Sequence, residues 1–138
     1  MALQYITKNI LKRDSGEALL ELPYDIGFIA GYDFETLKSD ILIQTYGVLI
    51  MARPGKFVGD IGHLETQCTG TSLICDVLKN DVTIYSSKPQ FAVSTSDMSV
   101  GVLSTTTFVS GDRITFKVTQ IGSSAPGQGL RFMLKCKV

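Results

Sequence analysis

Along the last nine residues of the chain, Leu130, Phe132, Leu134, Cys136 and Val138 alternate with Arg131, Met133, Lys135 and Lys137, so one face is apolar and the other is largely polar. The segment Arg113–Val118 repeats the pattern, with Ile114, Phe116 and Val118 at the apolar positions. Because successive side chains of a β-strand point to opposite faces of a sheet, this alternation predicts strands with one buried and one solvated face. Such one-sided strands indicate antiparallel sheets, since parallel sheets are usually covered on both faces.

Short runs of β-branched and aromatic residues continue along the chain from Tyr24 onward. Gly, Pro, Asn and Asp separate the runs about every ten residues, which is typical of all-β domains. The predicted strands are Tyr24–Tyr32, Ile41–Ala52, Phe57–Gln67, Thr71–Lys79, Val82–Ser86, Gln90–Thr95, Gly101–Val109, Arg113–Ile121 and Leu130–Val138. They predict one antiparallel β-sandwich of jelly-roll type over residues 23–138.

Asn80 and Asp81 are the only residues between two of the predicted strands. A two-residue connection of this kind closes a tight β-hairpin. Both residue types tolerate the positive φ that such a turn needs. We therefore expect a hairpin at this point and a second short turn at residues 110–112.

Residues 1–22 precede the regular strand pattern and differ from it in composition. Two interpretations stay open: an N-terminal arm that contacts another protein, or an ordinary edge strand or short helix of the domain. Apolar residues in so short a segment need a partner surface to offset their ordering entropy, and cations beside them can pair with acidic groups. On the arm interpretation, the partner-binding residues are Tyr5, Ile6, Ile10, Leu11, Lys12 and Arg13.

The charge balance and hydropathy exclude two classes of partner. Thirteen Lys and Arg residues balance thirteen Asp and Glu residues, whereas nucleic-acid-binding proteins usually carry a basic stripe that replaces phosphate counterions. The most apolar stretch, Ile41–Ala52, is interrupted by polar residues and is shorter than the roughly 20 apolar residues that span a bilayer. We expect no nucleic-acid partner, no membrane segment and no secretory signal.

The three cysteines, Cys68, Cys75 and Cys136, are odd in number and form no CxxC pair. This arrangement argues against a disulfide framework and against a zinc ribbon. Each cysteine lies in an apolar or alternating stretch, where a thiol behaves as a small buried hydrophobic group. The pattern predicts free, buried thiols and synthesis in a reducing cytoplasm.

The chain offers few residues for catalysis or metal binding. Its single histidine, His63, shares a predicted strand face with Glu65, but a metal site needs three or four converging ligands, and the sequence shows no such set. Asp76 and Asp112 are interpreted as strand-end and turn residues. The five tyrosines can stack on sugars or pack in a core equally well. We therefore predict a non-enzymatic protein with no catalytic residue, no cofactor and no metal.

Turn and strand residues of the second half of the chain form an ordered set. The set comprises Gly70-Thr71-Ser72-Leu73-Ile74, Asp76-Val77, Lys79-Asn80, Ile84-Tyr85, Lys88-Pro89, Ser110-Gly111-Asp112-Arg113-Ile114, Gln120-Ile121-Gly122-Ser123 and Pro126-Gly127. In its order and spacing the set resembles a β-sandwich domain of phage virions, found in head-decoration proteins and tail-fibre tips. At the first hairpin that pattern usually has Asn-Gly, whereas this chain has Asn80-Asp81.

The resemblance implies a structural protein of a bacteriophage particle, synthesised in the host cytoplasm. Since the chain is short, we expect a capsid decoration, or cement, protein on the outer surface of the phage head that bridges capsomers. The expected partners are the major capsid protein and further copies of the chain in a homotrimer. The alternative is a tail-fibre or baseplate domain that binds host glycans, and location at the tail tip instead of the head would distinguish it.

Overall fold

The structure of the protein, a computed structural model, describes residues 21–35 and 37–138. These residues form only strands, turns and loops, which confirms the prediction of an all-β chain. Within this part of the chain, no helix has the length and apolar composition needed to cross a membrane. The strands are β1 (Ile26–Ala30), β2 (Thr45–Ile50), β3 (Gly55–Thr66), β4 (Leu73–Lys79), β5 (Val82–Thr83), β6 (Tyr85–Ser87), β7 (Gln90–Phe91), β8 (Val102–Leu103), β9 (Thr107–Phe108), β10 (Arg113–Gln120) and β11 (Gln128–Lys137).

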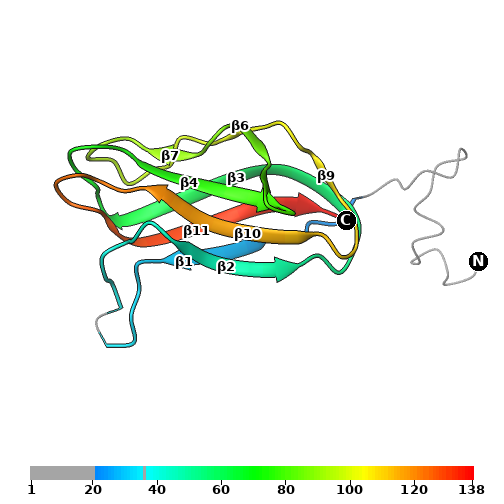
Figure 1. Ribbon diagram of the computed structural model, residues 1–138, viewed down its shortest axis with the longest axis horizontal. Helices are drawn as coiled ribbons and strands as arrows, with labels where there is room; N and C mark the ends of the chain where they lie inside the picture. Colours follow the sequence, from blue (N-terminus) through cyan, green and yellow to red (C-terminus); the bar gives the residue numbers. More distant parts are fainter. Residues whose placement is uncertain (1–20, 36) are drawn as a thin grey trace, which may run out of the picture.

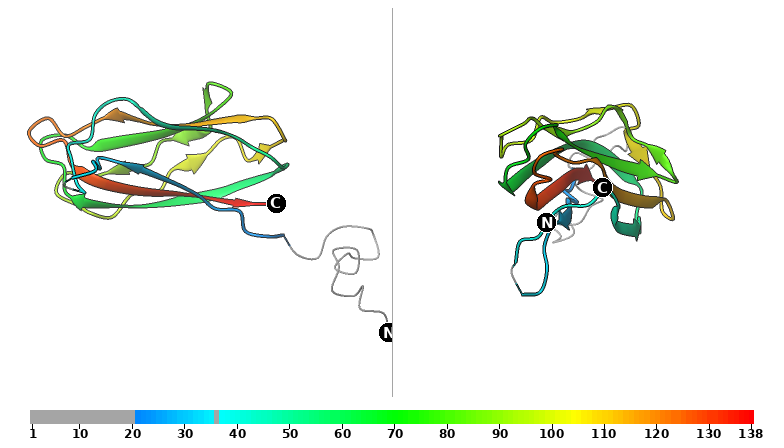
Figure 2. Two further views of the ribbon diagram at one scale, coloured as in Figure 1. Left: turned by 90° about the horizontal axis from the view of Figure 1, so that it is seen from below. Right: turned by 60° about the vertical axis from the view of Figure 1, so that its left-hand side comes forward.

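Two antiparallel sheets make up most of the described chain (Figure 1). One has the strand order β1-β11-β3-β9, and the other has the order β2-β10-β4-β5, with β7 also paired to β4. The short strands β6 and β8 form a separate two-stranded sheet. The two larger sheets lie over one another as two layers, with β11 and β3 in one layer and β10 and β4 in the other (Figure 2).

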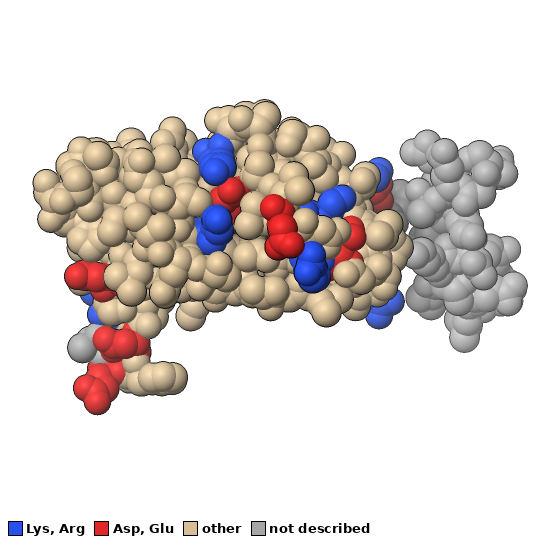
Figure 3. All heavy atoms as spheres, viewed as in Figure 1, with Lys and Arg blue, Asp and Glu red and all other residues tan. Residues whose placement is uncertain are grey.

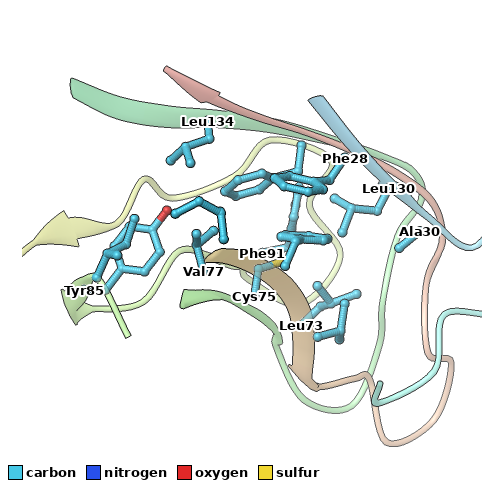
Figure 4. Close-up of a cluster of buried hydrophobic side chains, with 14 of the residues drawn as sticks. Phe28, Ala30, Leu73, Cys75, Val77, Tyr85, Phe91, Leu130 and Leu134 are labelled. Atoms are coloured by element: carbon cyan, nitrogen blue, oxygen red, sulfur yellow. The ribbon is translucent and has the colours of Figure 1, made fainter. Parts of the chain in front are cut away.

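The hydrophobic core lies between these layers (Figure 4). The ring of Phe116 in β10 lies 4.8 Å from that of Phe132 in β11 and 5.0 Å from that of Phe28 in β1, measured between centroids. These ring contacts join the two sheets. Seven side chains of β10 and β11 are buried at positions that were predicted to face inward. They are Ile114, Phe116, Val118, Leu130, Phe132, Leu134 and Cys136.

The hairpin at Asn80 and Asp81 forms as predicted. The two residues have φ angles of 50° and 70°, so both adopt the left-handed conformation that a two-residue turn of this kind requires. Asp81 thus occupies the position at which the resembled pattern usually has glycine. The turn is also tied to the start of β10, because the Asn80 N–H donates to the Arg113 carbonyl and the Arg113 N–H donates to Asn80 Oδ1, each at 2.9 Å.

Two predicted strands are each broken into two pieces. The predicted strand Val82–Ser86 changes sheets at Ile84, whose carbonyl accepts hydrogen bonds from the N–H groups of Ser104 and Thr105 instead of continuing a ladder. β5 therefore stays with β4, whereas β6 pairs with β8. The predicted strand Gly101–Val109 likewise contributes β8 to the small sheet and β9 to the sheet of β3. Strong β propensity in both segments could not reveal these changes of partner.

A loop projects from the layers between β1 and β2 (Figure 1). Its neck is closed by Ser39, whose N–H donates to the Gly31 carbonyl at 2.8 Å. Gly31 has a φ of 71°, and a Cβ at this position would clash with Ile41 and with the Ser39 carbonyl. We call residues 32–35 and 37–39 the projecting loop.

The first and last described residues lie side by side. The Leu22 N–H donates to the Val138 carbonyl at 3.0 Å, and the Val138 N–H donates to the Leu22 carbonyl at 2.9 Å. Glu21 forms an ion pair with Lys56 at 3.4 Å and another with Lys137 at 4.0 Å. Backbone hydrogen bonding to the C-terminal residue therefore begins at Leu22, one residue before the predicted domain start at residue 23.

Candidate functional site

The outward face of the β1-β11-β3 sheet presents a regular grid of side chains. Strand pairing places Arg131 of β11 between Ile29 of β1 and His63 of β3, and it places Met133 opposite Ile61. These positions alternate along each strand with the core residues, so they point away from the other layer. The same alternation that builds the core therefore builds an exposed, largely apolar surface behind it.

A groove of about 870 Å³ runs over this face. Residues 97–100 lie along β3 and form one wall, because the Met98 N–H donates to the Gly62 carbonyl and Asp97 forms a bridge with His63. We call it the outer groove. It is lined by Gly27, Phe28, Ile29, Ile61, Gly62, His63, Asp97, Met98, Val100, Arg131, Phe132 and Met133.

Several apolar side chains in the outer groove are open to solvent. Ile29, Ile61 and Val100 are 61%, 55% and 63% exposed, and Met133 is 39% exposed. Isolated exposed apolar residues are common on soluble proteins, but a contiguous apolar concavity with a polar rim is typical of a binding surface. The outer groove is therefore a candidate partner-binding surface of the described chain.

The rim of the outer groove is polar and internally paired. Arg131 forms an ion pair with Glu65 at 2.6 Å and lies 5.8 Å from the centroid of the Tyr32 ring. The Tyr32 hydroxyl donates to Glu65 Oε1 at 3.2 Å. Burial, and then the negative charge of Glu65, raise the pKa of Tyr32. These contacts hold Arg131 against the loop neck, at the edge of the groove.

His63 and Glu65 share the outward face of β3, as predicted, but they do not form a pair. His63 Nδ1 lies 3.8 Å from Asp97, whereas Glu65 contacts Arg131 and Tyr32. Among the described residues, no group of three or more His, Cys, Asp or Glu side chains is placed to hold a metal ion. The outer groove thus has an apolar floor and a charged rim, and His63 is the one histidine in its lining.

Asp112 and Asp76 have different environments. Asp112 is a turn residue, as predicted: it accepts the Val109 N–H at 2.8 Å, and this bond, followed by the one from the Asn80 side chain, lowers the pKa of Asp112. The prediction of a strand-end or turn position is wrong for Asp76. It lies within β4, buried, with an ion pair to Lys88 at 3.1 Å and a hydrogen bond from the Thr83 hydroxyl. Thr83 and Lys88, which follow the hairpin, contact the Asp76 side chain.

A second buried carboxylate, Asp60, was missed from the sequence. It faces the core from β3, and both of its oxygens accept the Gly101 N–H, at 3.1 and 3.2 Å. The Tyr85 hydroxyl is buried without a hydrogen-bond partner among the described residues. Burial, and then the negative charge of Asp60, raise the pKa of Tyr85. Neither residue lines the outer groove, so this pair is part of the interior.

The three thiols are free and buried, which confirms the prediction for Cys68, Cys75 and Cys136. Burial is the main cause that raises the pKa of Cys75 and that of Cys136. Cys75 and Cys136 are therefore protonated packing groups at neutral pH. The predicted partner-binding residues lie outside the described residues; they are Tyr5, Ile6, Ile10, Leu11, Lys12 and Arg13.

Comparisons of the chain with protein-family models, with curated proteins and with solved structures found no match.

Proposed function

We propose that this chain is a structural, non-enzymatic protein of a bacteriophage particle that binds other proteins of that particle. In this proposal the two layers form one jelly-roll-like β-sandwich, and residues 1–22 form an arm. The observation that carries the binding role is the outer groove, because a sheet face that is not needed for the core nevertheless keeps Ile29, Ile61 and Met133 exposed. Apolar surface of this kind is stabilised when a partner removes it from water.

The resemblance to phage virion domains supports the choice of particle. Several of the residues that carry it contact one another across the ends of β4 and β10. The Thr71 hydroxyl donates to the Ile121 carbonyl at 2.8 Å, and the Gln120 side-chain amide donates to the Ser72 carbonyl at 2.7 Å. These contacts hold the segment before β4 against the end of β10. The resembling residues are thus structural, and the function is taken from the resemblance by analogy.

Within the particle, we propose a decoration protein on the outer surface of the phage head. It would bridge copies of the major capsid protein as a homotrimer after synthesis in the host cytoplasm. The formal net charge of zero provides little long-range repulsion between neighbouring copies, which suits a protein packed densely on a shell. The alternative is a tail-fibre or baseplate domain whose exposed surface binds host glycans.

The test is a co-sedimentation titration of the full chain with purified phage heads that lack it, at matched salt. We expect saturable binding, with density on the outer shell in particle images. Deleting residues 2–13 is expected to leave a folded β-domain that decorates heads less tightly. Equal decoration by the truncated chain would refute the arm, whereas binding only to tail tips or to host glycans would refute the head location.

A further inference from the structure

The tip of the projecting loop carries two exposed apolar side chains. Phe34 is 107% exposed and Leu37 is 71% exposed, so neither side chain packs on the β-domain of its own chain. Leu37 also has a φ of 69°, a left-handed conformation that is uncommon for a non-glycine residue. A fully exposed phenylalanine on a projecting loop is the type of side chain that anchors protein interfaces when it enters an apolar pocket.

The neck of the loop is firmly attached to the β-domain. Besides the bond between Ser39 and Gly31, the Gln128 side-chain amide donates to Asp40 Oδ1 at 2.7 Å, and Lys38 Nζ lies 3.3 Å from the Thr66 hydroxyl. The tip is therefore presented from a tethered base, which lowers the ordering cost of binding through it.

The loop carries several carboxylates, and a lysine lies beside the outer groove, whose own charged lining residues are Arg131, paired with Glu65, and Asp97, which lies 3.8 Å from His63. Three carboxylates, Asp33, Glu35 and Asp40, lie on or beside the projecting loop. Figure 3 shows acidic side chains gathered on this projection. Next to the outer groove, Lys135 points outward from β11, two residues after Met133. Neither Glu35 nor Lys135 forms an ion pair within the described part of its own chain, so each charge is available to the other across an interface.

We propose that the loop tip of one copy binds in the outer groove of a second copy. Phe34 and Leu37 would cover the apolar floor formed by Ile61 and Met133, and Glu35 would approach Lys135. The inference rests on the proposed function, because it names the partner of the same groove. The contact joins the loop of one copy to the groove of another, so the two surfaces differ and the interface is heterologous. A heterologous interface can close into a ring, and a homotrimer with cyclic symmetry is a ring of three copies.

The first experiment measures self-association of the purified full chain by sedimentation velocity, without any phage particle. The wild-type chain is expected to associate in a concentration-dependent way. Phe34→Asp on the loop and Met133→Asp in the groove are each expected to weaken association by at least about tenfold, since each places a charge in an apolar contact. The control is Val82→Asp, at a side chain that is 66% exposed in β5, away from both surfaces; it should associate like the wild type.

A mixing experiment tests whether the two surfaces bind each other. In a mixture of the Phe34→Asp and Met133→Asp chains, the intact loop of the Met133→Asp chain can enter the intact groove of the Phe34→Asp chain. At a concentration at which each variant alone is monomeric, we expect the mixture to form a one-to-one heterodimer and no larger ring. As a second groove variant, Ile61→Asn covers the case in which Met133→Asp perturbs folding, which circular dichroism would detect.

Several results would overturn this inference. They are a monomeric wild-type chain at all concentrations, unchanged association of the Phe34→Asp chain, or a mixture that stays monomeric. Loss of association on deleting residues 2–13 and in the Met133→Asp chain, with the Phe34→Asp chain unaffected, would instead identify the N-terminal segment as the occupant of the groove. Failure to bind phage heads leaves these results unchanged, so the two proposals fail separately.

Discussion

The two faces of the β1-β11-β3 sheet are built from the same strands and differ in almost every other respect. Toward β10, Phe132 and its neighbours are closed off from water and pack in ring contacts. On the outward face, Arg131 and Met133, one residue to either side, are exposed around a groove. Stability and the proposed binding role therefore fall on alternate residues of one strand. Single substitutions can separate them.

The largest loss of stability is expected from a substitution on the inner face. Phe132→Ala removes a buried ring that contacts Phe116 across the layers, and it should lower the free energy of unfolding by about 3 to 5 kcal/mol. Chemical denaturation of the purified chain measures this loss. A loss below about 1 kcal/mol would mean that the two faces of β11 are inverted.

A smaller effect is expected at the polar residue of the inner face. Asp60→Ala leaves the Gly101 N–H without its acceptor in a buried environment, which should lower the free energy of unfolding by about 1 to 3 kcal/mol. Asp60→Asn is the matched control, because it keeps an acceptor oxygen of similar shape and should lose less. If both variants lose the same amount in urea denaturation, the hydrogen bond to Gly101 is not what stabilises this site.

The inner face should also respond to alkaline pH. Burial, and then the negative charge of Asp25, raise the pKa of Cys136 from 9.0 to about 12. The folded chain thus keeps a proton that the unfolded thiol loses, so the stability that this group contributes is present below pH 9 and falls as the pH rises toward 12. Cys136→Ala should make the decline of the urea midpoint between pH 9 and pH 10.5 less steep. Parallel declines in both chains would contradict this assignment.

The smallest effect on stability is expected on the outward face. Ile61→Thr keeps a β-branched side chain in β3 and removes only exposed apolar surface, so the free energy of unfolding should change by less than about 0.5 kcal/mol. The same variant should weaken binding through the outer groove. A loss of stability comparable to that of Phe132→Ala would show that Ile61 belongs to the core.

Local patterns revealed the inner face well. The alternation in Leu130–Val138 predicted which side chains of β11 are buried, and Asn80-Asp81 predicted a hairpin, because both signals depend only on neighbouring residues. The outer groove could not be predicted in this way. Ile29, Ile61 and Met133 come from three strands that are distant in sequence, and only the pairing register brings them together.

The position of Asp60 was hidden by an irregularity of β3. Strict alternation from the buried Phe57 would point Asp60 outward. In the structure, Cys136 pairs with Phe57 and Lys135 pairs with Gly59, so Val58 is an extra residue and the following side chains change face. Asp76 was misplaced for another reason, since its burial depends on Lys88 and Thr83 from a later part of the chain.

The reciprocal hydrogen bonds between Leu22 and Val138 make the described domain a nearly closed loop of chain. Paired residues in neighbouring strands lie only about 5 Å apart, so a short glycine linker can join these two positions. The hairpin at Asn80 and Asp81 is then a suitable place for new ends, because it is exposed and joins only adjacent strands. A circular permutant of this kind would move the chain ends away from Glu21, which suits the display of a fused peptide at the hairpin.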